Sequence, residues 1–167
     1  GPDALGVSDN PDLPHKWSPT ENVLWKRDIA GRGWSSPVVW GNRVFLTTAI
    51  NEGKAKEPKK GLYFGGNQYK PSEHVHHWKV ICLNLEDGKV LWEKLARKGK
   101  PQGSIHVKNS YATETPVTDG ERVYAYFGNH GLYCYTVEGK LLWDKQWPPH
   151  KTRYGWGLAA SPILHEG

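Results

Sequence analysis

The sequence predicts an all-β protein built from short antiparallel strands. Glycine and proline number 19 and 12 among the 167 residues, and this high share favours turns over long helices. Nine tryptophans and eight tyrosines stand against three phenylalanines and no methionine, a composition typical of half-buried sheet surfaces. In addition, segments of the chain recur at regular intervals, which is the signature of a repeat architecture.

The first recurring segment opens at a proline. Residues 35–46 return as residues 114–125, and a third copy begins at residues 160–164. In the two full copies the proline leads a short apolar run, a turn containing glycine follows, and an alternating strand comes next. Each copy therefore predicts a pair of antiparallel strands.

The second recurring segment ends at a tryptophan. Residues 86–92, Glu-Asp-Gly-Lys-Val-Leu-Trp, return in shortened form as residues 138–143, Glu-Gly-Lys-Leu-Leu-Trp, and the tail of the same pattern stands at residues 22–26. The strand at residues 78–85 precedes the first of these turns. One unit therefore holds four short antiparallel strands.

The spacing of the units predicts β-propeller blades. Pro116 and Pro162 are 46 residues apart, and Trp92 and Trp143 are 51 apart, which is the length of a four-stranded blade. The first unit is longer by about 28 residues, which fall between its second and third strands. Two to three such blades do not close a ring, so we expect an incomplete propeller and a chain that is a fragment of a larger protein.

The expected organisation follows from these repeats. It consists of a lead-in at 1–21, the last strand of a preceding or closing blade at 22–30, a first blade at 31–98 with a surface insertion at about 50–77, a second blade at 99–149, and the start of a third, truncated blade at 150–167.

Three tryptophans are expected to hold the blades together. Trp25, Trp92 and Trp143 each end the outermost strand of a successive unit. An indole buried between two sheets removes on the order of 200 Å² from water, a stabilisation of a few kcal/mol. The recurrence of these residues indicates a structural role.

The surroundings of these tryptophans resemble the tryptophan-docking repeat of pyrroloquinoline-quinone-like (PQQ-like) propellers. The matching positions are Cys82, Asn84, Gly88, Lys89 and Trp92, and again Cys134, Thr136, Gly139, Lys140 and Trp143. The resemblance implies a docking role for Gly88 and Gly139 beside the tryptophans. Asn84 and Asp87 replace the usual Asp and Thr of the repeat, and the second copy is one residue shorter at its turn.

The PQQ-like family includes quinoprotein alcohol dehydrogenases, the propeller lipoprotein of the outer-membrane assembly machine, and many uncharacterised exported bacterial proteins. The lead-in from Leu13 to Lys26 is most similar to that of the exported members. The resemblance therefore implies a periplasmic, cell-surface or extracellular location. No signal peptide and no run of apolar residues long enough for a membrane span is present in the sequence.

Cys82 and Cys134 occupy the same slot in adjacent units, so their sulfur atoms should lie on neighbouring sheets about 10 Å apart. We expect two buried free thiols and no disulfide. The quinoprotein dehydrogenases carry a disulfide of adjacent cysteines, and this chain has no adjacent cysteine pair.

Candidate binding residues lie in the loops that lead into each first strand, because these loops surround one mouth of a propeller channel. They are Arg32, Trp34, Tyr111, Glu114, Arg153 and Trp156. Such a polar and aromatic rim suits a sugar, a planar cofactor or a peptide. The alternative is that these side chains only pack and seal the channel.

We expect no catalytic residues and no metal site. No carboxylate pair, nucleophile elbow or phosphate loop is recognisable. The histidines at 74, 76 and 77 match no metal-ligand spacing and suggest an exposed loop. The net charge of +5 arises from scattered basic residues, a pattern that argues against nucleic-acid binding.

The leading hypothesis is a non-catalytic binding or scaffolding propeller without a cofactor. Its partners would be further propeller blades or neighbouring chains, with a small molecule or glycan at the channel mouth. The alternative is part of a quinoprotein oxidoreductase that holds pyrroloquinoline quinone and Ca²⁺ at that mouth.

Overall fold

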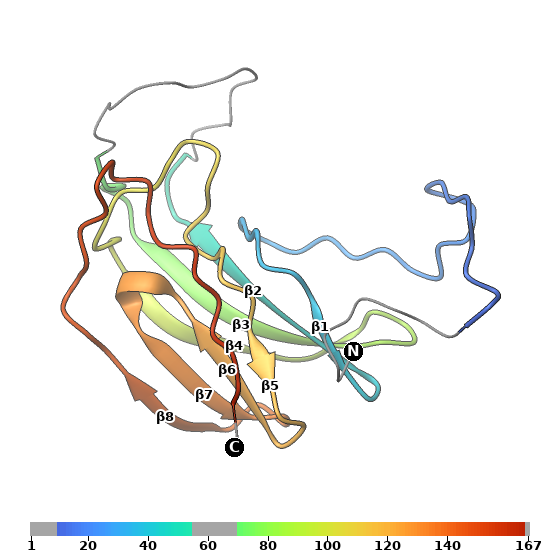
Figure 1. The fold of residues 1–167 in the computed structure, drawn as a ribbon. Coiled ribbons are helices and arrows are strands. Elements are labelled where there is room, and N and C mark those ends of the chain that lie inside the picture. Colours follow the sequence, from blue (N-terminus) through green and yellow to red (C-terminus); the bar gives the residue numbers. More distant parts are fainter. Residues whose placement is uncertain (1–9, 55–69, 166–167) are drawn as a thin grey trace.

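The computed structural model describes residues 10–54 and 70–165, and these residues form two four-stranded antiparallel sheets (Figure 1). The first sheet has the order β1-β2-β3-β4 and the second the order β5-β6-β7-β8. Within each sheet, the strands therefore pair in the order of the sequence. The prediction of an all-β fold made of propeller blades is confirmed, with two blades formed.

The strand bounds show how the two blades differ in size. The first blade consists of β1 (Val38–Trp40), β2 (Arg43–Asn51), β3 (His76–Asn84) and β4 (Val90–Gly99). The second blade consists of β5 (Val117–Thr118), β6 (Arg122–Tyr126), β7 (Leu132–Thr136) and β8 (Leu141–Lys145), with a 3₁₀ turn η1 (Gly128–His130) between β6 and β7. In the first blade a much longer connection replaces η1, which is where the sequence predicts its insertion. Because β2 reaches Asn51 and β3 begins at His76, that connection covers 52–75, and its residues 55–69 lie outside the described residues.

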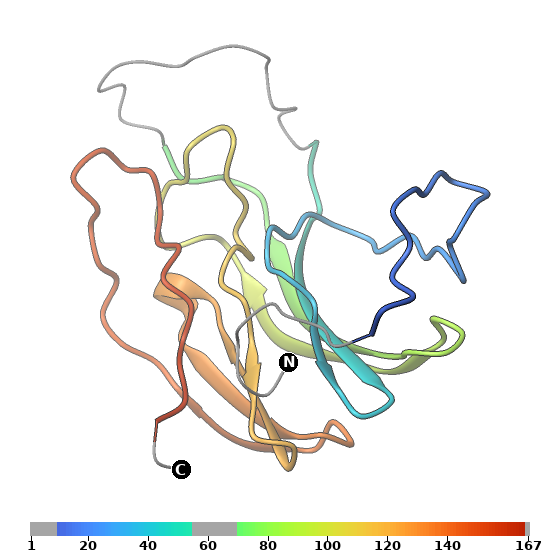
Figure 2. The ribbon, with the colours of Figure 1, turned by 45° about the vertical axis from the view of Figure 1, so that its right-hand side comes forward.

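Two predicted segments differ from the observed elements. The structure assigns no strand to residues 22–30, where the last strand of another blade was expected, and none to the described residues 150–165. A strand needs a neighbouring backbone to pair with, and neither segment lies at the edge of a described sheet. Both run as irregular chain outside the two sheets (Figures 1 and 2), and the second segment makes a turn at residues 152–155.

The core of the molecule is the seam between the two sheets. Phe45, Val80 and Trp92 of the first blade pack against Val123 and Tyr135 of the second. These residues alternate along their strands with others that face away, as the two-residue period of a strand requires.

The opposite face of the first blade is covered by the lead-in. Val44, Ile81 and Leu83 form a second buried cluster, and Trp25 and Ile29 pack against it. The first sheet is therefore covered on both faces. Cys82 and Cys134 are buried free thiols, as predicted.

Candidate functional site

Two indole rings each donate a hydrogen bond to a backbone carbonyl of the following unit. The Trp25 Nε1–H donates to the Leu85 carbonyl at 2.7 Å, and the Trp92 Nε1–H donates to the Val137 carbonyl at 2.9 Å. Leu85 lies three residues after Cys82, and Val137 lies three residues after the equivalent Cys134. The two contacts are therefore made at equivalent positions of the repeat.

A glycine lies directly beneath each of these two rings. Gly88 and Gly139 have φ of +66° and +86°, and a Cβ added at either would come within 3 Å of the Trp25 or Trp92 ring. Glycine is therefore required at both turns, for conformation and for space.

A second set of contacts joins the units at the inner end of the strands. The Ser36 N–H donates to Thr115 Oγ1 at 3.0 Å, and the Thr115 N–H donates to Ser161 Oγ at 2.9 Å. These three residues each precede the proline that opens a unit. The third unit therefore begins beside the second blade, at the place where the second blade begins beside the first.

The loop of residues 100–113 forms the rim at one end of the blades. Figures 1 and 2 show it between the segment that enters β1 and the segment at 150–158. Trp34 donates its backbone N–H to the Ala112 carbonyl and its Nε1–H to the Lys108 carbonyl, both at 2.9 Å. On the other side, the Trp156 carbonyl accepts from the His106 N–H at 3.1 Å and from Asn109 Nδ2 at 3.2 Å.

The structure separates the six predicted rim residues into two groups. Trp34 and Trp156 are 51% and 44% exposed on either side of the 106–109 turn. Arg153 lies 5.1 Å from the ring centre of Tyr154, which packs beside Trp156. Arg32 is half-buried, because its backbone pairs with Ala49 of β2.

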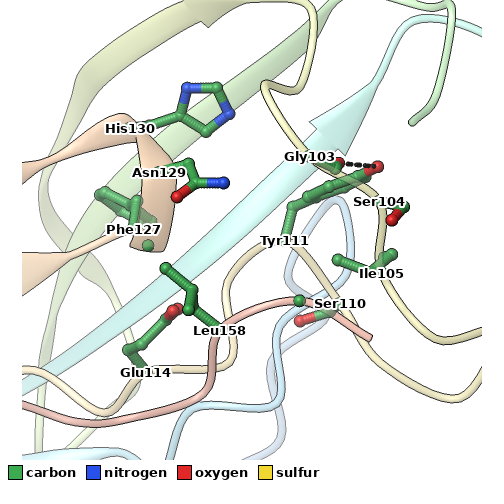
Figure 3. Close-up of a pocket in the computed structure, with 12 residues that line it drawn as sticks. Gly103, Ser104, Ile105, Ser110, Tyr111, Glu114, Phe127, Asn129, His130 and Leu158 are labelled. Carbon is green, nitrogen blue, oxygen red and sulfur yellow. Dashed lines mark hydrogen bonds between the residues drawn. The ribbon is translucent and has the colours of Figure 1, made fainter. Parts of the chain in front are cut away.

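Tyr111 and Glu114 form the second group, and they face inward. They line a cavity of about 30 Å³ beneath the rim (Figure 3). Its other lining residues come from loop 103–110, from the end of β6 with η1, and from Gly157 and Leu158. A cavity of this size holds one or two water molecules and no larger ligand.

Glu114 is the buried carboxyl group of this cavity. Its side chain is 3% exposed, and the hydrogen bond that reaches it from the Thr113 N–H is 3.3 Å long. Burial raises the pKa of Glu114 to about 7, against the weaker lowering effect of the Glu114 and Thr113 amides. The group is therefore partly protonated near neutral pH, and Gly128 leaves the space for it, because a Cβ there would lie 3.1 Å from Glu114 Oε1.

An aromatic and histidine cluster next to the cavity was not predicted. The His130 ring lies 3.9 Å from the Trp78 ring centre, and His76 packs edge-on to Tyr111 at 5.0 Å. Burial lowers the pKa of His130 to about 4 and also lowers that of His76, so both rings are neutral at pH 7. The expectation of an exposed histidine loop is wrong for His76, which is buried in the seam.

Tyr111 fixes the loop over this cluster. Its hydroxyl donates to the Gly103 carbonyl at 3.1 Å and accepts from the Ser72 N–H at 3.2 Å. Burial raises the pKa of Tyr111, so the hydroxyl stays protonated. The Tyr111 ring therefore seals the inside of the rim, while Trp34 and Trp156 face solvent.

The rim presents side chains that can make noncovalent contacts. Its exposed groups are indole, phenol, guanidinium and amine, which stack, donate hydrogen bonds and carry positive charge. Within residues 10–54 and 70–165, no three histidine, cysteine or carboxylate side chains lie close enough together to hold a metal ion.

Comparison with known proteins gives the family. Residues 4–146 match the family model of PQQ-like repeats described as outer membrane protein assembly factor BamB. The chain belongs to this PQQ-like family. No curated protein shows significant sequence similarity to it.

Membership in this family explains why the two blades share the same turn and tryptophan pattern.

No helix among the described residues is long and apolar enough to cross a membrane.

Proposed function

We propose that this PQQ-like propeller chain acts by binding, with the blades as a rigid scaffold and the rim as the contact surface. The observation that carries the proposal is the rim itself, where Trp34 and Trp156 expose their rings on the two segments that flank the loop of residues 100–113 and are hydrogen-bonded to it. A surface that is rigid before binding loses less conformational freedom when a ligand arrives.

The seams support the scaffold part of the proposal. In it, Trp25, Trp92 and Trp143 are docking residues that join one blade to the next, and Gly88 and Gly139 receive the rings. The repeat-related contacts at Leu85 and Val137 are what this role requires. Further blades, or blades of neighbouring chains, would cover the outer face of the second blade.

The family supports a location outside the cytoplasm. The matching family model is described as an outer membrane protein assembly factor, and such a factor acts by contact with other proteins. We therefore place this protein in the periplasm or at the cell surface. In this proposal it acts there as a non-catalytic component.

A quinoprotein oxidoreductase is the alternative, and the described residues do not fit its cofactor. The cavity beneath the rim is about 30 Å³, while pockets for cofactors and similar ligands measure roughly 300–1,000 Å³. A larger open hollow of about 470 Å³ lies at the β5–β6 and β7–β8 turns, away from the rim. We therefore derive no step through a quinone.

Equilibrium dialysis tests the choice between the two functions. The purified chain is dialysed against pyrroloquinoline quinone with Ca²⁺, and retained quinone absorbance and dye-linked alcohol oxidation are measured. We expect neither retention nor activity, because the cavity beneath the rim, where the alternative puts the quinone, is only about 30 Å³. Stoichiometric retention together with dye reduction would overturn the proposed function.

A further inference from the structure

The charge of the rim limits the class of ligand that it can bind. The three segments that build it, residues 30–36, 99–113 and 145–161, contain no aspartate and no glutamate. Of the acidic residues that border these segments, Glu114 is buried, Asp144 is exposed, and Glu73 is paired with Lys100 of the loop at 3.4 Å. The rim also carries basic residues: Arg153 lies over the Tyr154 ring, and Lys108 is an exposed residue whose backbone carbonyl accepts from the Trp34 indole.

The aromatic groups of the rim form a row. Arg153 lies over Tyr154, the Tyr154 and Trp156 ring centres are 5.1 Å apart, and His106 packs edge-on to Trp156 at 5.6 Å. The Ser104 hydroxyl donates to the Gly155 carbonyl at 2.8 Å, so this row is tied to the loop behind it. The row is therefore a shallow, fixed surface with a cation at one end.

We infer that this rim binds an acidic saccharide, with sugar rings stacked on Trp156 and Trp34 and sugar carboxylates paired with Arg153 and Lys108. This inference rests on the proposed binding function. Sugar rings present apolar C–H faces together with hydroxyl groups, which suits exposed aromatic rings beside hydrogen-bond donors. Arginine pairs with a carboxylate through two parallel hydrogen bonds, and that pairing favours an acidic sugar over a neutral one.

The shape of the rim favours an extended saccharide over a peptide. A buried side chain needs a pocket, and the cavity beneath Tyr111 is only about 30 Å³. An extended peptide needs an unpaired strand edge, and the described rim segments are loops without strands. A chain of sugar rings needs neither, because it lies across a surface.

Titration of the purified chain with hexagalacturonate, maltohexaose and a single-stranded DNA hexamer tests the inference. Calorimetry or tryptophan fluorescence reports binding. We expect hexagalacturonate to bind at least tenfold more tightly than maltohexaose, a difference of about 1.4 kcal/mol. Its affinity should fall as salt rises, since exposed charges are screened.

Variants localise the site. We expect W156A to weaken hexagalacturonate binding by roughly tenfold or more and R153Q by roughly fivefold, as for removal of a stacking or charge-assisted contact. The matched controls are W17A, at a tryptophan that is 73% exposed in the lead-in, and K89Q, in the turn at the far end of the first blade. Both should bind as the unchanged protein does. Circular dichroism and urea midpoints establish that each variant is folded, and W156F replaces W156A if the latter is not.

Four results would overturn the inference. They are equal binding of maltohexaose, tighter binding of the DNA hexamer, loss of binding in W17A as large as in W156A, and an absence of all binding. The proposed function is decided separately, because its test measures quinone retention and not saccharide affinity.

Discussion

The two blades carry equivalent rows of side chains, and only the row of the first blade faces another described blade. In the first blade, Phe45, Cys82 and Trp92 are cross-strand neighbours that face the second blade, and Trp92 is 9% exposed. In the second blade, the row of Tyr124, Cys134 and Trp143 has the same register but faces away from the first, and Trp143 is 40% exposed.

The difference shows that packing against a neighbouring blade buries the tryptophan. Within its own sheet, each tryptophan is a cross-strand neighbour of a buried cysteine. What Trp92 gains is the Val137 carbonyl and the glycine turn of the next blade, contacts that a single sheet cannot supply.

Alanine substitutions at the two tryptophans give the largest expected effect. W92A should lower the free energy of unfolding by about 3–5 kcal/mol, because it opens a cavity in the seam and removes a hydrogen bond. W143A should cost about 1 kcal/mol or less, since much of its ring already meets water. Urea denaturation followed by fluorescence measures both, and equal losses would contradict the comparison.

The titration of Glu114 is expected to change the free energy of unfolding by up to about 3 kcal/mol. Glu114 has its folded pKa raised to about 7, so the folded state holds a proton that the unfolded state loses. Its contribution to stability is therefore complete below about pH 4.5 and is lost as the pH rises towards 7.

His130 acts in the opposite direction. Its pKa is lowered to about 4 by burial, so its contribution is present above about pH 6.5 and is lost as the pH falls. The two slopes oppose each other between about pH 4.5 and 6.5. We expect E114Q to be more stable than the unchanged protein at pH 8 and to lose stability more steeply on acidification. Urea midpoints from pH 4 to 8 measure this, and parallel curves for the two proteins would contradict it.

The hydroxyl contact at the inner seam gives the smallest expected effect. T115V keeps the shape of the side chain and removes the acceptor of the Ser36 N–H, which should cost about 1 kcal/mol. T115S keeps the acceptor and serves as the control. Hydrogen exchange of the Ser36 amide should speed up in T115V and stay near its original rate in T115S. If the two variants exchange alike, the hydroxyl does not join the blades.

The blades and the family were predicted from the sequence because both depend on local patterns. A proline, an alternating strand and a glycine turn specify a hairpin wherever they occur, and their recurrence at blade length indicates the propeller. The predicted strands at β2, β3 and β6 correspond to those observed. The resemblance to PQQ-like repeats was confirmed by the family match.

The cavity and its histidines could not be predicted in the same way. His130 belongs to η1, and the described residues of the first blade's β2–β3 connection include no such turn, so no repeat marks it. Its burial depends on Trp78, which is 52 residues earlier in the chain. Tyr111 and Glu114 were singled out as rim residues, but their sequence positions do not tell whether their side chains face solvent or the cavity. The docking role of the tryptophans, the rim ligand and the location outside the cytoplasm remain predictions.

Residue order alone was enough to set the strands, the turns at Gly88 and Gly139 and the spacing of the tryptophans, since these follow from backbone preferences within a few residues. Only the tertiary structure shows that Trp92 is buried while Trp143 is half exposed, and that Glu114 is buried rather than solvated. Burial is a property of what lies across a seam, and repeats that are alike in sequence meet different neighbours.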